Sequence, residues 1–463
     1  MTTQQSHGPA ASSGASATRV RWLILAMLFV ITTINYADRA TIAIAGPELK
    51  KVLGLSPVQM GFIFSAFAWS YVVAQLPGGW LLDRFGSRIT YFVSISLWSI
   101  FTMLMGTVGF FTGAAAVTAL FALRLLVGAA EAPSFPGNSR ITSAWFPTAE
   151  RGTAAAIFNS AQYFATVLFA PIMGWLVHTF GWQSVFYVMG ALGLLTGLVW
   201  LKVIYGPRDH PRINAAELSF IEAGGALIDL ESKSQSVQSE ALDTWSCIKQ
   251  LLSNRMMLGV YIGQYCINTL TYFFLTWFPV YLVSERHMTI LKAGFVAALP
   301  AVAGFFGGVL GGVLSDRLIK SGKSLSVARK TPIVGGLLLA MSMIICNYVE
   351  SDWVVVMVMS LAFFGKGVGA LGWAVVADTS PKEAGGLSGA LFNTFGNTAG
   401  ITTPIVIGYI LQESGSFAGA LVFVGANAAV AVLAYLLLVG EIKRFEFKLP
   451  VRRAAQPAIA PVA

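Results

Sequence analysis

The sequence predicts an all-α polytopic membrane protein with twelve transmembrane helices in two six-helix halves. Of its 463 residues, 56% are hydrophobic and only 11% are charged, whereas soluble domains are about 45–50% apolar and about 25% charged. Twelve stretches are long and apolar enough to cross a bilayer, which takes about 20 residues of helix. A glycine-rich segment also occurs once in each half of the chain, as expected if the halves are related.

The predicted spans form two groups of six, separated by a polar stretch. They are 20–44, 57–81, 88–110, 112–138, 152–177, 181–204, 256–284, 290–315, 330–349, 352–377, 385–411 and 416–440. The polar stretch contains the run SKSQSVQSE, and we expect a short amphipathic helix within 214–228. The first 18 residues lack the apolar core of a signal peptide and are expected to be disordered. The domains are thus a tail (1–18), an N-terminal half (19–204), a linker (205–253), a C-terminal half (254–441) and a second tail (442–463).

The basic residues predict the orientation of these spans. Cytoplasmic connections of membrane proteins are enriched in Lys and Arg. If both termini are cytoplasmic, most of the 30 basic residues fall in cytoplasmic segments, and the outer connections carry only Lys50, Lys51, Arg286 and Lys292. The net charge of +9 is therefore explained by membrane topology and requires no nucleic-acid partner.

A sequence repeat relates the two halves. PGGWLLDRFGSR follows the second predicted span, and GGVLGGVLSDRL follows the eighth. Small residues let helices approach closely, so we expect these segments to join helix ends and to act in gating. The residues assigned to this role are Gly79, Asp83, Arg84, Gly86, Arg88, Asp316 and Arg317. Two such halves indicate a pseudo-twofold axis along the membrane normal.

Five ionisable residues lie well inside predicted spans: Asp38, Arg39, Arg124, Glu131 and Lys366. Each costs about 2.5–3.5 kcal/mol on insertion scales, so such residues are candidates for function. Asp38 and Arg39 are neighbours, about 100° apart around a helix, and should face different directions. Arg124 and Glu131 are seven residues apart, on one face and about 10.5 Å apart along the axis, so they can share a cavity. Static pairing between helices is the alternative.

Glu131 is the most informative of these charges. Pro133 and Pro136 follow it and should bend or end the helix there, as a gate requires. Burial favours the protonated form of a carboxyl, and a nearby cation favours the ionised form. Glu131 can therefore hold a proton while Arg124 is turned away or engaged by a substrate, and release it when Arg124 is free.

Several motifs resemble the major facilitator superfamily, and within it the anion:cation symporter branch. GGWLLDRFGSR resembles the loop signature of the superfamily, and NYADRAT, FSAFAWSY, EAPSFP, AWFPTAERGTA and FFLTWFPVYL resemble the branch. GQYCINTL and AFFGKGVGALGW look closest to bacterial D-glucarate/D-galactarate proton symporters. The resemblance covers residues 20–448, the linker only in part. It implies the major facilitator fold and proton-coupled uptake of a sugar acid across the bacterial inner membrane.

The resemblance also implies roles for individual residues. The residues matching Asp38 and Glu131 are the protonatable pair of the family. The residues matching Tyr36, Tyr71, Gln162, Gln264, Trp373 and Asn393 line its substrate site. Asn268 is a further polar candidate for substrate binding, although Asn and Gln side chains inside spans can equally bond from helix to helix.

Arg39 and Lys366 are the expected anchors for the substrate. A guanidinium binds a carboxylate with two parallel hydrogen bonds, and an aldaric acid has a carboxylate at each end. Lys366 is in the opposite half from Arg39, and twelve residues, about 18 Å of helix, separate it from Asp378. Related monoacid transporters look similar at Arg39 but commonly carry a neutral residue at the position of Lys366. Glucarate and galactarate, with glycerate as a related acid, are therefore favoured over a monoacid such as galactonate or a hexuronate.

Other functional classes find little support in the sequence. Cys247, Cys266 and Cys346 lack paired or metal-ligand spacing, and we see no phosphate-binding, nucleophile or zinc motif of an enzyme. A sensor would need a signalling domain, and a channel would not need the buried carboxylates and cations. We therefore expect a monomeric carrier without a cofactor, whose partners are a sugar acid anion, protons and membrane lipid.

Overall fold

A computed structural model describes residues 17–230, 244–381 and 385–447, and no strand occurs in these ranges. The N-terminal half contains α1 (Val20–Leu53), α2 (Pro57–Met105), α3 (Gly113–Glu131), α4 (Ser134–Trp145), α5 (Arg151–Phe180) and α6 (Trp182–Val203). The connecting segment contains α7 (Ala215–Ala223) and α8 (Thr244–Ser253). The C-terminal half contains α9 (Arg255–Tyr272), α10 (Phe278–Ser284), α11 (Ile290–Lys320), α12 (Leu325–Ala340), α13 (Asp352–Val368), α14 (Gly372–Thr379), α15 (Gly385–Ser414) and α16 (Ala418–Leu433). The tail residues 1–16 and 448–463 and the run SKSQSVQSE lie outside the described residues.

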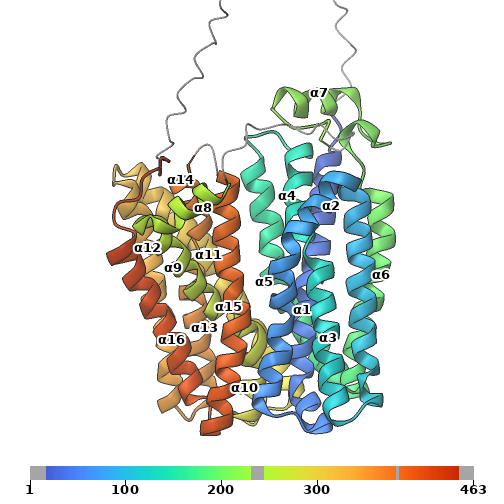
Figure 1. Ribbon diagram of the computed structural model, residues 1–463, viewed down its shortest axis with the longest axis vertical. Helices are drawn as coiled ribbons and strands as arrows, with labels where there is room; N and C mark the ends of the chain where they lie inside the picture. The colour runs from blue at the N-terminus through green and yellow to red at the C-terminus, as the bar shows by residue number, and fades with distance from the viewer. Residues whose placement is uncertain (1–16, 231–243, 382–384, 448–463) are drawn as a thin grey trace, which may run out of the picture.

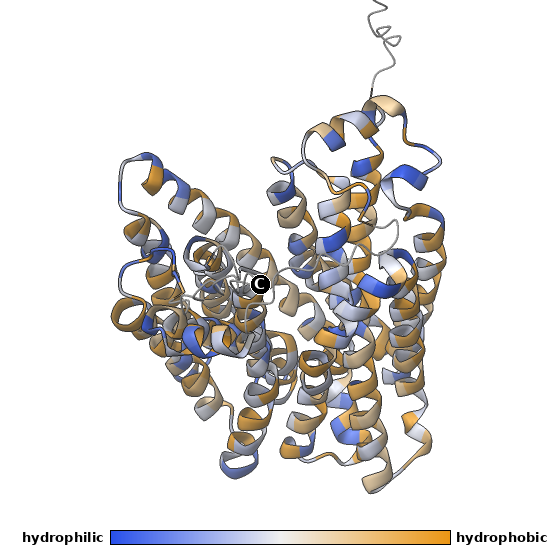
Figure 2. Cartoon of the chain, turned by 45° about the horizontal axis from the view of Figure 1, so that its top comes forward, coloured by the Kyte–Doolittle hydropathy of each residue, from blue (hydrophilic) through white to orange (hydrophobic). Residues whose placement is uncertain are grey.

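The two halves stand side by side as helical bundles (Figure 1). Both ends of the described chain lie at the same end of the molecule as α7, which we call the α7 end; the opposite end, where α10 lies, is the α10 end (Figure 1). Hydrophobic residues follow the helices along most of their length (Figure 2). This distribution is typical of a bundle that faces lipid.

The helices match the predicted spans in place but not one for one. Ten stretches of the described residues are long and apolar enough to cross a membrane. The longest, Pro57–Phe110, combines the predicted spans 57–81 and 88–110. Within α2, Gly86 leaves the helical conformation with a φ of 76° and a ψ of 162°, which glycine adopts without strain. Two helices therefore meet at a kink between the predicted spans. α15 is not among the ten, because its Asn and Thr residues lower its hydropathy.

Proline determines where the fourth predicted span breaks. α3 ends at Glu131, Pro133 is the N-cap of α4, and the chain continues as a second helix from Ser134. Proline lacks the N–H that a helix interior needs. The predicted interruption beside Glu131 is confirmed, so this carboxyl lies at a helix end.

The two halves approach each other most closely near the α10 end. A Cβ on Gly61 of α2 would lie 2.5 Å from the carbonyl oxygen of Pro404 on α15. A Cβ on Gly294 of α11 would lie 2.7 Å from the carbonyl oxygen of Ala170 on α5. Only glycine allows such contact between helix backbones. Small residues thus bring the halves together through α2–α15 and α5–α11.

The linker segment around α7 is folded against the N-terminal half. The carboxylate of Glu217, fully buried, accepts hydrogen bonds from the Thr18 hydroxyl (2.7 Å), the Val20 amide (2.9 Å) and Arg21 (3.1 Å). Asn214 caps α7 by accepting from the Glu217 amide at 2.9 Å. Because α1 begins at Val20, Glu217 supplies partners for amides that a helix start leaves unpaired.

Further contacts hold the rest of this segment in place. Arg151 donates to the carbonyl of Gly225 at 2.7 Å, and the Leu227 amide donates to Ser143 at 2.9 Å. His210 lies 5.4 Å from the ring of Trp145, and burial lowers its pKa. Residues 207–230 are therefore a folded part of the N-terminal half, whereas the sequence indicated only a polar connection with a short helix.

Candidate functional site

Four of the predicted charged residues are buried together between α1, α2 and α3. Asp38, Arg39, Arg124 and Glu131 are each no more than 6% exposed. Arg39 Nε on α1 donates to Glu131 Oε2 on α3 at 2.8 Å. The sequence coupled the protonation of Glu131 to Arg124 and assigned Arg39 to the substrate, whereas the structure pairs Glu131 with Arg39, as the alternative of pairing between helices would have it. Spacing along one helix does not reveal a partner on another.

Asp38 and Arg39 point to different helices, as their positions on α1 require. Asp38 Oδ2 accepts a hydrogen bond from the Thr102 hydroxyl of α2 at 2.7 Å. Thr102 is fully buried, and it was not a candidate in the sequence because threonine is unremarkable within a span. Each carboxylate in the cluster therefore has one partner on a neighbouring helix.

Aromatic rings surround the guanidinium of Arg39. Its Cζ lies 4.9 Å from the ring centre of Tyr36, 4.6 Å from that of Phe67 and 4.9 Å from that of Tyr71. Ring faces attract cations, more strongly where water is excluded. These rings place Tyr36 and Tyr71, both predicted site residues, directly against Arg39.

The cluster retains unused hydrogen-bonding capacity. Within the described residues, Asp38 Oδ1, Glu131 Oε1, Arg39 Nη2 and both Nε and Nη1 of Arg124 have no hydrogen-bond partner. Buried polar atoms without partners are costly and are commonly satisfied by water or a ligand. The cluster is therefore suited to receive a proton, water or an anion.

Lys366 is buried in the C-terminal half. It lies on α13, is 5% exposed, and its Nζ is 5.7 Å from the ring of Tyr163 and 5.0 Å from that of Phe363. No ion pair to Lys366 occurs in the part of the chain that the structure describes. Asp378, the alternative partner considered above, instead pairs with Arg329 at 2.8 Å. Lys366 is therefore a buried amine surrounded by aromatic rings.

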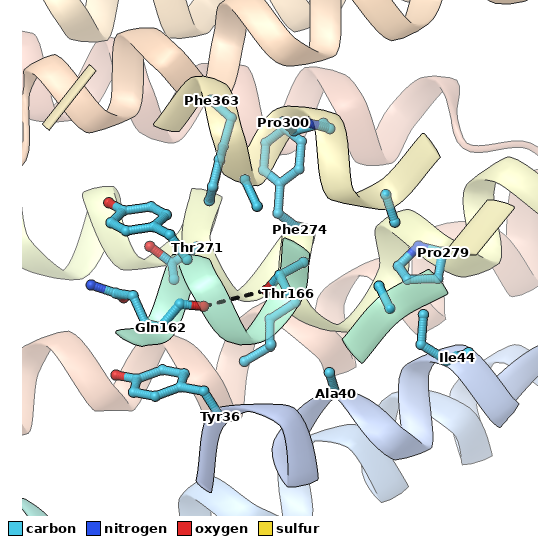
Figure 3. Close-up of a pocket in the computed structure, with 15 residues that line it drawn as sticks. Tyr36, Ala40, Ile44, Gln162, Thr166, Thr271, Phe274, Pro279, Pro300 and Phe363 are labelled. Carbon is cyan, nitrogen blue, oxygen red and sulfur yellow. Dashed lines mark hydrogen bonds between the residues drawn. The ribbon is translucent and has the colours of Figure 1, made fainter. Parts of the chain in front are cut away.

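A cavity of about 60 Å³ lies between the two halves (Figure 3). Its lining includes two predicted site residues, Tyr36 and Gln162, together with Tyr163 and Phe363, which flank Lys366. A water needs about 10–15 Å³ of such space, so the cavity holds a few waters and is too small for a six-carbon acid. A substrate would require the halves to move apart here.

The sequence reasoning missed three polar residues of this cavity: Tyr163, Thr166 and Thr271. Thr271 was detectable, because it lies seven residues after Gln264 and three after Asn268, on the same face of α9. Tyr163 follows Gln162 directly, and its position against Lys366 depends on packing between halves.

The predicted amides of the C-terminal half form two hydrogen-bonded sets. Gln264 Nε2 donates to Asn268 Oδ1 at 3.5 Å. Asn393 Nδ2 donates to Oε1 of Gln75, in the other half, at 3.1 Å, and Asn397 donates to Asn393 Oδ1 at 3.1 Å. The Gln75–Asn393 bond joins α2 to α15 across the two halves and agrees with the alternative that amides connect helices, whereas the other two bonds lie within α9 and within α15.

Trp373 lies apart from the buried cluster. Its side chain is 56% exposed, and its ring centre is 4.9 Å from that of Phe392. Trp373 is the second residue of α14, which lies toward the α7 end (Figure 1). The structure therefore leaves Trp373 exposed and outside the buried cluster.

The first loop segment is held by contacts between different helices. Asp83 pairs with Arg140 of α4 at 2.6 Å, and Arg140 also donates to the Leu230 carbonyl at 2.8 Å. Arg88 donates to the Leu201 carbonyl at 2.6 Å. Arg84 lies 5.4 Å from the Trp80 ring and 5.7 Å from the Phe85 ring. The expected joining of helix ends uses Arg140, which the sequence reasoning did not identify.

The glycine pairs of the two loop segments, Gly78–Gly79 and Gly311–Gly312, pack alike. Gly78 and Gly311 lie against neighbouring helices, whereas a Cβ on Gly79 or Gly312 would meet nothing within 4 Å. Each pair stands at the same distance before its aspartate, Asp83 or Asp316. Among the described residues, neither Asp316 nor Arg317 forms an ion pair. The repeat is therefore visible in packing more than in ion pairs.

Comparison with known proteins places this architecture in a family. Residues 28–329 match the family described as the Major Facilitator Superfamily. The probable galactarate/D-glucarate transporter GudP of Bacillus subtilis strain 168 is 64% identical, over 93% of this chain and 94% of that protein. The protein of the same name from Escherichia coli K12 is 62% identical, over 95% and 98% of the two chains.

More distant proteins support the same assignment. A D-galactonate transporter of Escherichia coli O6:H1 is 41% identical, over 92% of this chain and 97% of that protein. The solved structure of the xylose transporter XylE from E. coli, in an inward-open conformation, has a TM-score of 0.71 at 15% identity and covers 91% of this chain and 97% of that one. This structural likeness concerns the fold alone. The chain therefore belongs to the major facilitator superfamily.

Proposed function

We propose that this chain is a secondary active transporter that takes up D-glucarate and galactarate together with protons, by alternating access. The observation that carries the proposal is a buried Arg39–Glu131 ion pair in one half, with a buried Lys366 in the other. A diacid supplies one carboxylate for each of these two cations. The names of the two most similar relatives described above support the choice of substrate.

Proton coupling follows from competition for Arg39. While Glu131 is ionised it holds Arg39 at 2.8 Å. A proton on Glu131 removes that charge and frees the guanidinium for a substrate carboxylate. Asp38 is the second protonatable group, and Arg124, with its unpartnered Nε and Nη1, supplies the balancing positive charge. Proton and substrate therefore bind together in this scheme.

The remaining substrate contacts come from polar groups near the cavity. Tyr36, Gln162 and Tyr163 line it, and Gln264, Asn268 and Asn393 extend the polar surface along α9 and α15. A hydroxylated carbon chain needs donors and acceptors of this kind between its two carboxylates. Tyr71 holds the Arg39 guanidinium from the side.

We place the α7 end in the cytoplasm and the protein, as a monomer, in the bacterial inner membrane. The basis is the concentration of Lys and Arg in connections at that end, which marks the cytoplasmic side of membrane proteins. The gating segments around Asp83 and Asp316 and the exposed Trp373 then face the cytoplasm, where they would control substrate release.

The test is uptake of labelled glucarate into proteoliposomes under an imposed inward proton gradient. Galactarate and galactonate are compared as unlabelled competitors, and wild type is compared with Lys366→Asn. We expect galactarate to compete, galactonate to compete weakly, and Lys366→Asn to reduce glucarate uptake by roughly tenfold or more, because one charge-assisted carboxylate contact contributes about 1.5–3 kcal/mol.

The outcomes separate the candidate functions. If galactonate competes as well as galactarate and Lys366→Asn transports glucarate normally, the two-cation preference for a diacid is refuted, a monoacid becomes the favoured substrate, and Lys366 is structural. The 41% identity to a D-galactonate transporter makes that the second candidate. Uptake that does not respond to the proton gradient would refute the coupling.

A further inference from the structure

Phe67 lies between the two buried arginines of the N-terminal half. It is on α2 and is 3% exposed. Its ring centre is 4.6 Å from Arg39 Cζ and 5.4 Å from Arg124 Cζ. The ring also stacks on Tyr71, with centroids 5.2 Å apart and planes at 22°. One aromatic side chain therefore contacts both cations of the charge cluster.

The backbone of α2 is fixed against α3 at this position. Gly128 on α3 leaves no room for a Cβ because the Phe67 carbonyl lies against it. The Ser70 hydroxyl donates to the Leu125 carbonyl at 2.5 Å. Gly128 comes four residues after Arg124 and three before Glu131, so all three share one face of α3. The backbone of Phe67 thus packs on α3 at Gly128, between the positions of Arg124 and Glu131.

This position explains which arginine pairs with Glu131. Two of the Arg124 nitrogens have no hydrogen-bond partner among the described residues, although Glu131 Oε1 is also unpartnered. An arginine side chain is long and flexible enough to cover much of the two helical turns, about 10.5 Å, that separate these residues. The ring of Phe67 lies against the Arg124 guanidinium and attracts it.

We propose that Phe67 is a positioning residue that prevents an Arg124–Glu131 ion pair and so leaves Arg39 as the partner that Glu131 exchanges for a proton. The proposal rests on the proposed function, since it concerns the same proton-coupling cluster. Without the ring, Arg124 would join Arg39 at Glu131. Two cations would hold Glu131 ionised, and substrate exchange would continue without proton coupling.

Other titratable groups surround Glu131 and stay unchanged in the test. They are Asp38 and Tyr36 from α1, Tyr91 from α2 and Tyr272 from α9. Asp38 keeps its bond from Thr102. A change confined to Phe67 therefore alters the position of Arg124 without removing any ionisable group.

The experiment compares Phe67→Leu with wild type in proteoliposomes. Phe67→Tyr retains the ring, and Phe186→Leu is the matched control, because Phe186 is fully buried in the same half and its ring packs on Trp182. Glucarate counterflow without a gradient measures exchange, and uptake under an inward proton gradient measures accumulation. A second cation at ion-pair distance shifts protonation of a carboxyl by roughly one to three orders of magnitude, so we expect Phe67→Leu to accumulate about tenfold less or worse while its counterflow persists.

Each outcome decides one question. If wild type fails to accumulate glucarate, the proposed function fails. If wild type accumulates and Phe67→Leu does so equally, or Phe186→Leu shows the same defect, only the role of Phe67 is refuted. If Phe67→Leu shows no counterflow, a second assay measures proton uptake on glucarate binding in weakly buffered detergent solution. If Phe67→Leu takes up fewer protons per bound glucarate than wild type, the role of Phe67 is supported. If the number of protons is unchanged, the role is overturned.

Discussion

Arg39 is the residue on which both proposed ligands act. Its Nε is bound to Glu131, and three rings within 4.9 Å hold the plane of its guanidinium. A guanidinium presents several donors in a planar fork, whereas a lysine ammonium is a point charge on a flexible stem. The rings therefore fix the direction of the unpartnered donor Nη2, so that this N–H group is already oriented when a carboxylate approaches.

Glu131→Gln is expected to separate exchange from proton-driven accumulation. Glutamine keeps the size and a hydrogen-bond acceptor for Arg39, but it cannot gain or lose a proton. Counterflow of glucarate should therefore persist, while accumulation under a proton gradient should fall to the level reached without one. The two assays on the same proteoliposomes check this. Accumulation as high as in wild type would show that Glu131 is not a coupling residue.

At the scale of elements, α1 depends on α7 for its start. Arg19 at its N-cap provides no capping side chain, and Glu217 of α7 accepts from the amides of Val20 and Arg21 instead. A carboxylate at a helix N-terminus also interacts favourably with the helix dipole. The helix that carries Asp38 and Arg39 is thus anchored at its first turn by the linker.

Glu217→Gln should lower the stability of the folded protein. The change removes a buried charge that partners Arg21 at 3.1 Å, and removing one member of such a pair costs about 3–5 kcal/mol. We expect a clearly lower thermal unfolding midpoint in detergent. Glu222→Gln is the control, because Glu222 is 54% exposed and pairs with Arg208. Equal midpoints for the two variants would show that the Glu217 contacts contribute little.

At the scale of the whole molecule, the halves are closest at the α10 end. The helix pairs α2–α15 and α5–α11 meet there through Gly61 and Gly294. The cavity beside Tyr36 and Gln162 has a volume of about 60 Å³, which is enough for a few water molecules only. A transporter that works by alternating access must open this contact once in each cycle. The absence of side chains at these glycines lets the contact close tightly.

Gly294→Val should hold the halves apart at the α10 end. Its Cβ would overlap the Ala170 carbonyl, so the closed contact becomes unfavourable. We expect faster maleimide labelling of Ala297→Cys, a cavity-lining position, when the native cysteines are replaced. Gly335→Val is the control, since a Cβ there meets nothing within 4 Å. Labelling at the same rate in both variants would show that Gly294 does not keep this end closed.

The sequence allowed the fold to be predicted more fully than the contacts within the site. Hydropathy located the helices because lipid requires long apolar stretches, and buried charges identified Asp38, Arg39 and Glu131 for the same reason. The arginine that binds Glu131 comes from α1, and no spacing along α3 encodes that packing between helices. The docking of α7 likewise depends on tertiary contacts.

The docking of residues 207–230 has a consequence for how the chain could be assembled. Arg140, Arg151 and Glu217 tie this segment to the N-terminal half, so about half of the predicted linker is a component of that bundle. A chain divided between 231 and 243 would leave each fragment with the contacts described for its own bundle. Two separately translated fragments could then recombine through the glycine-lined helix surfaces, as subunits of a heterodimer do.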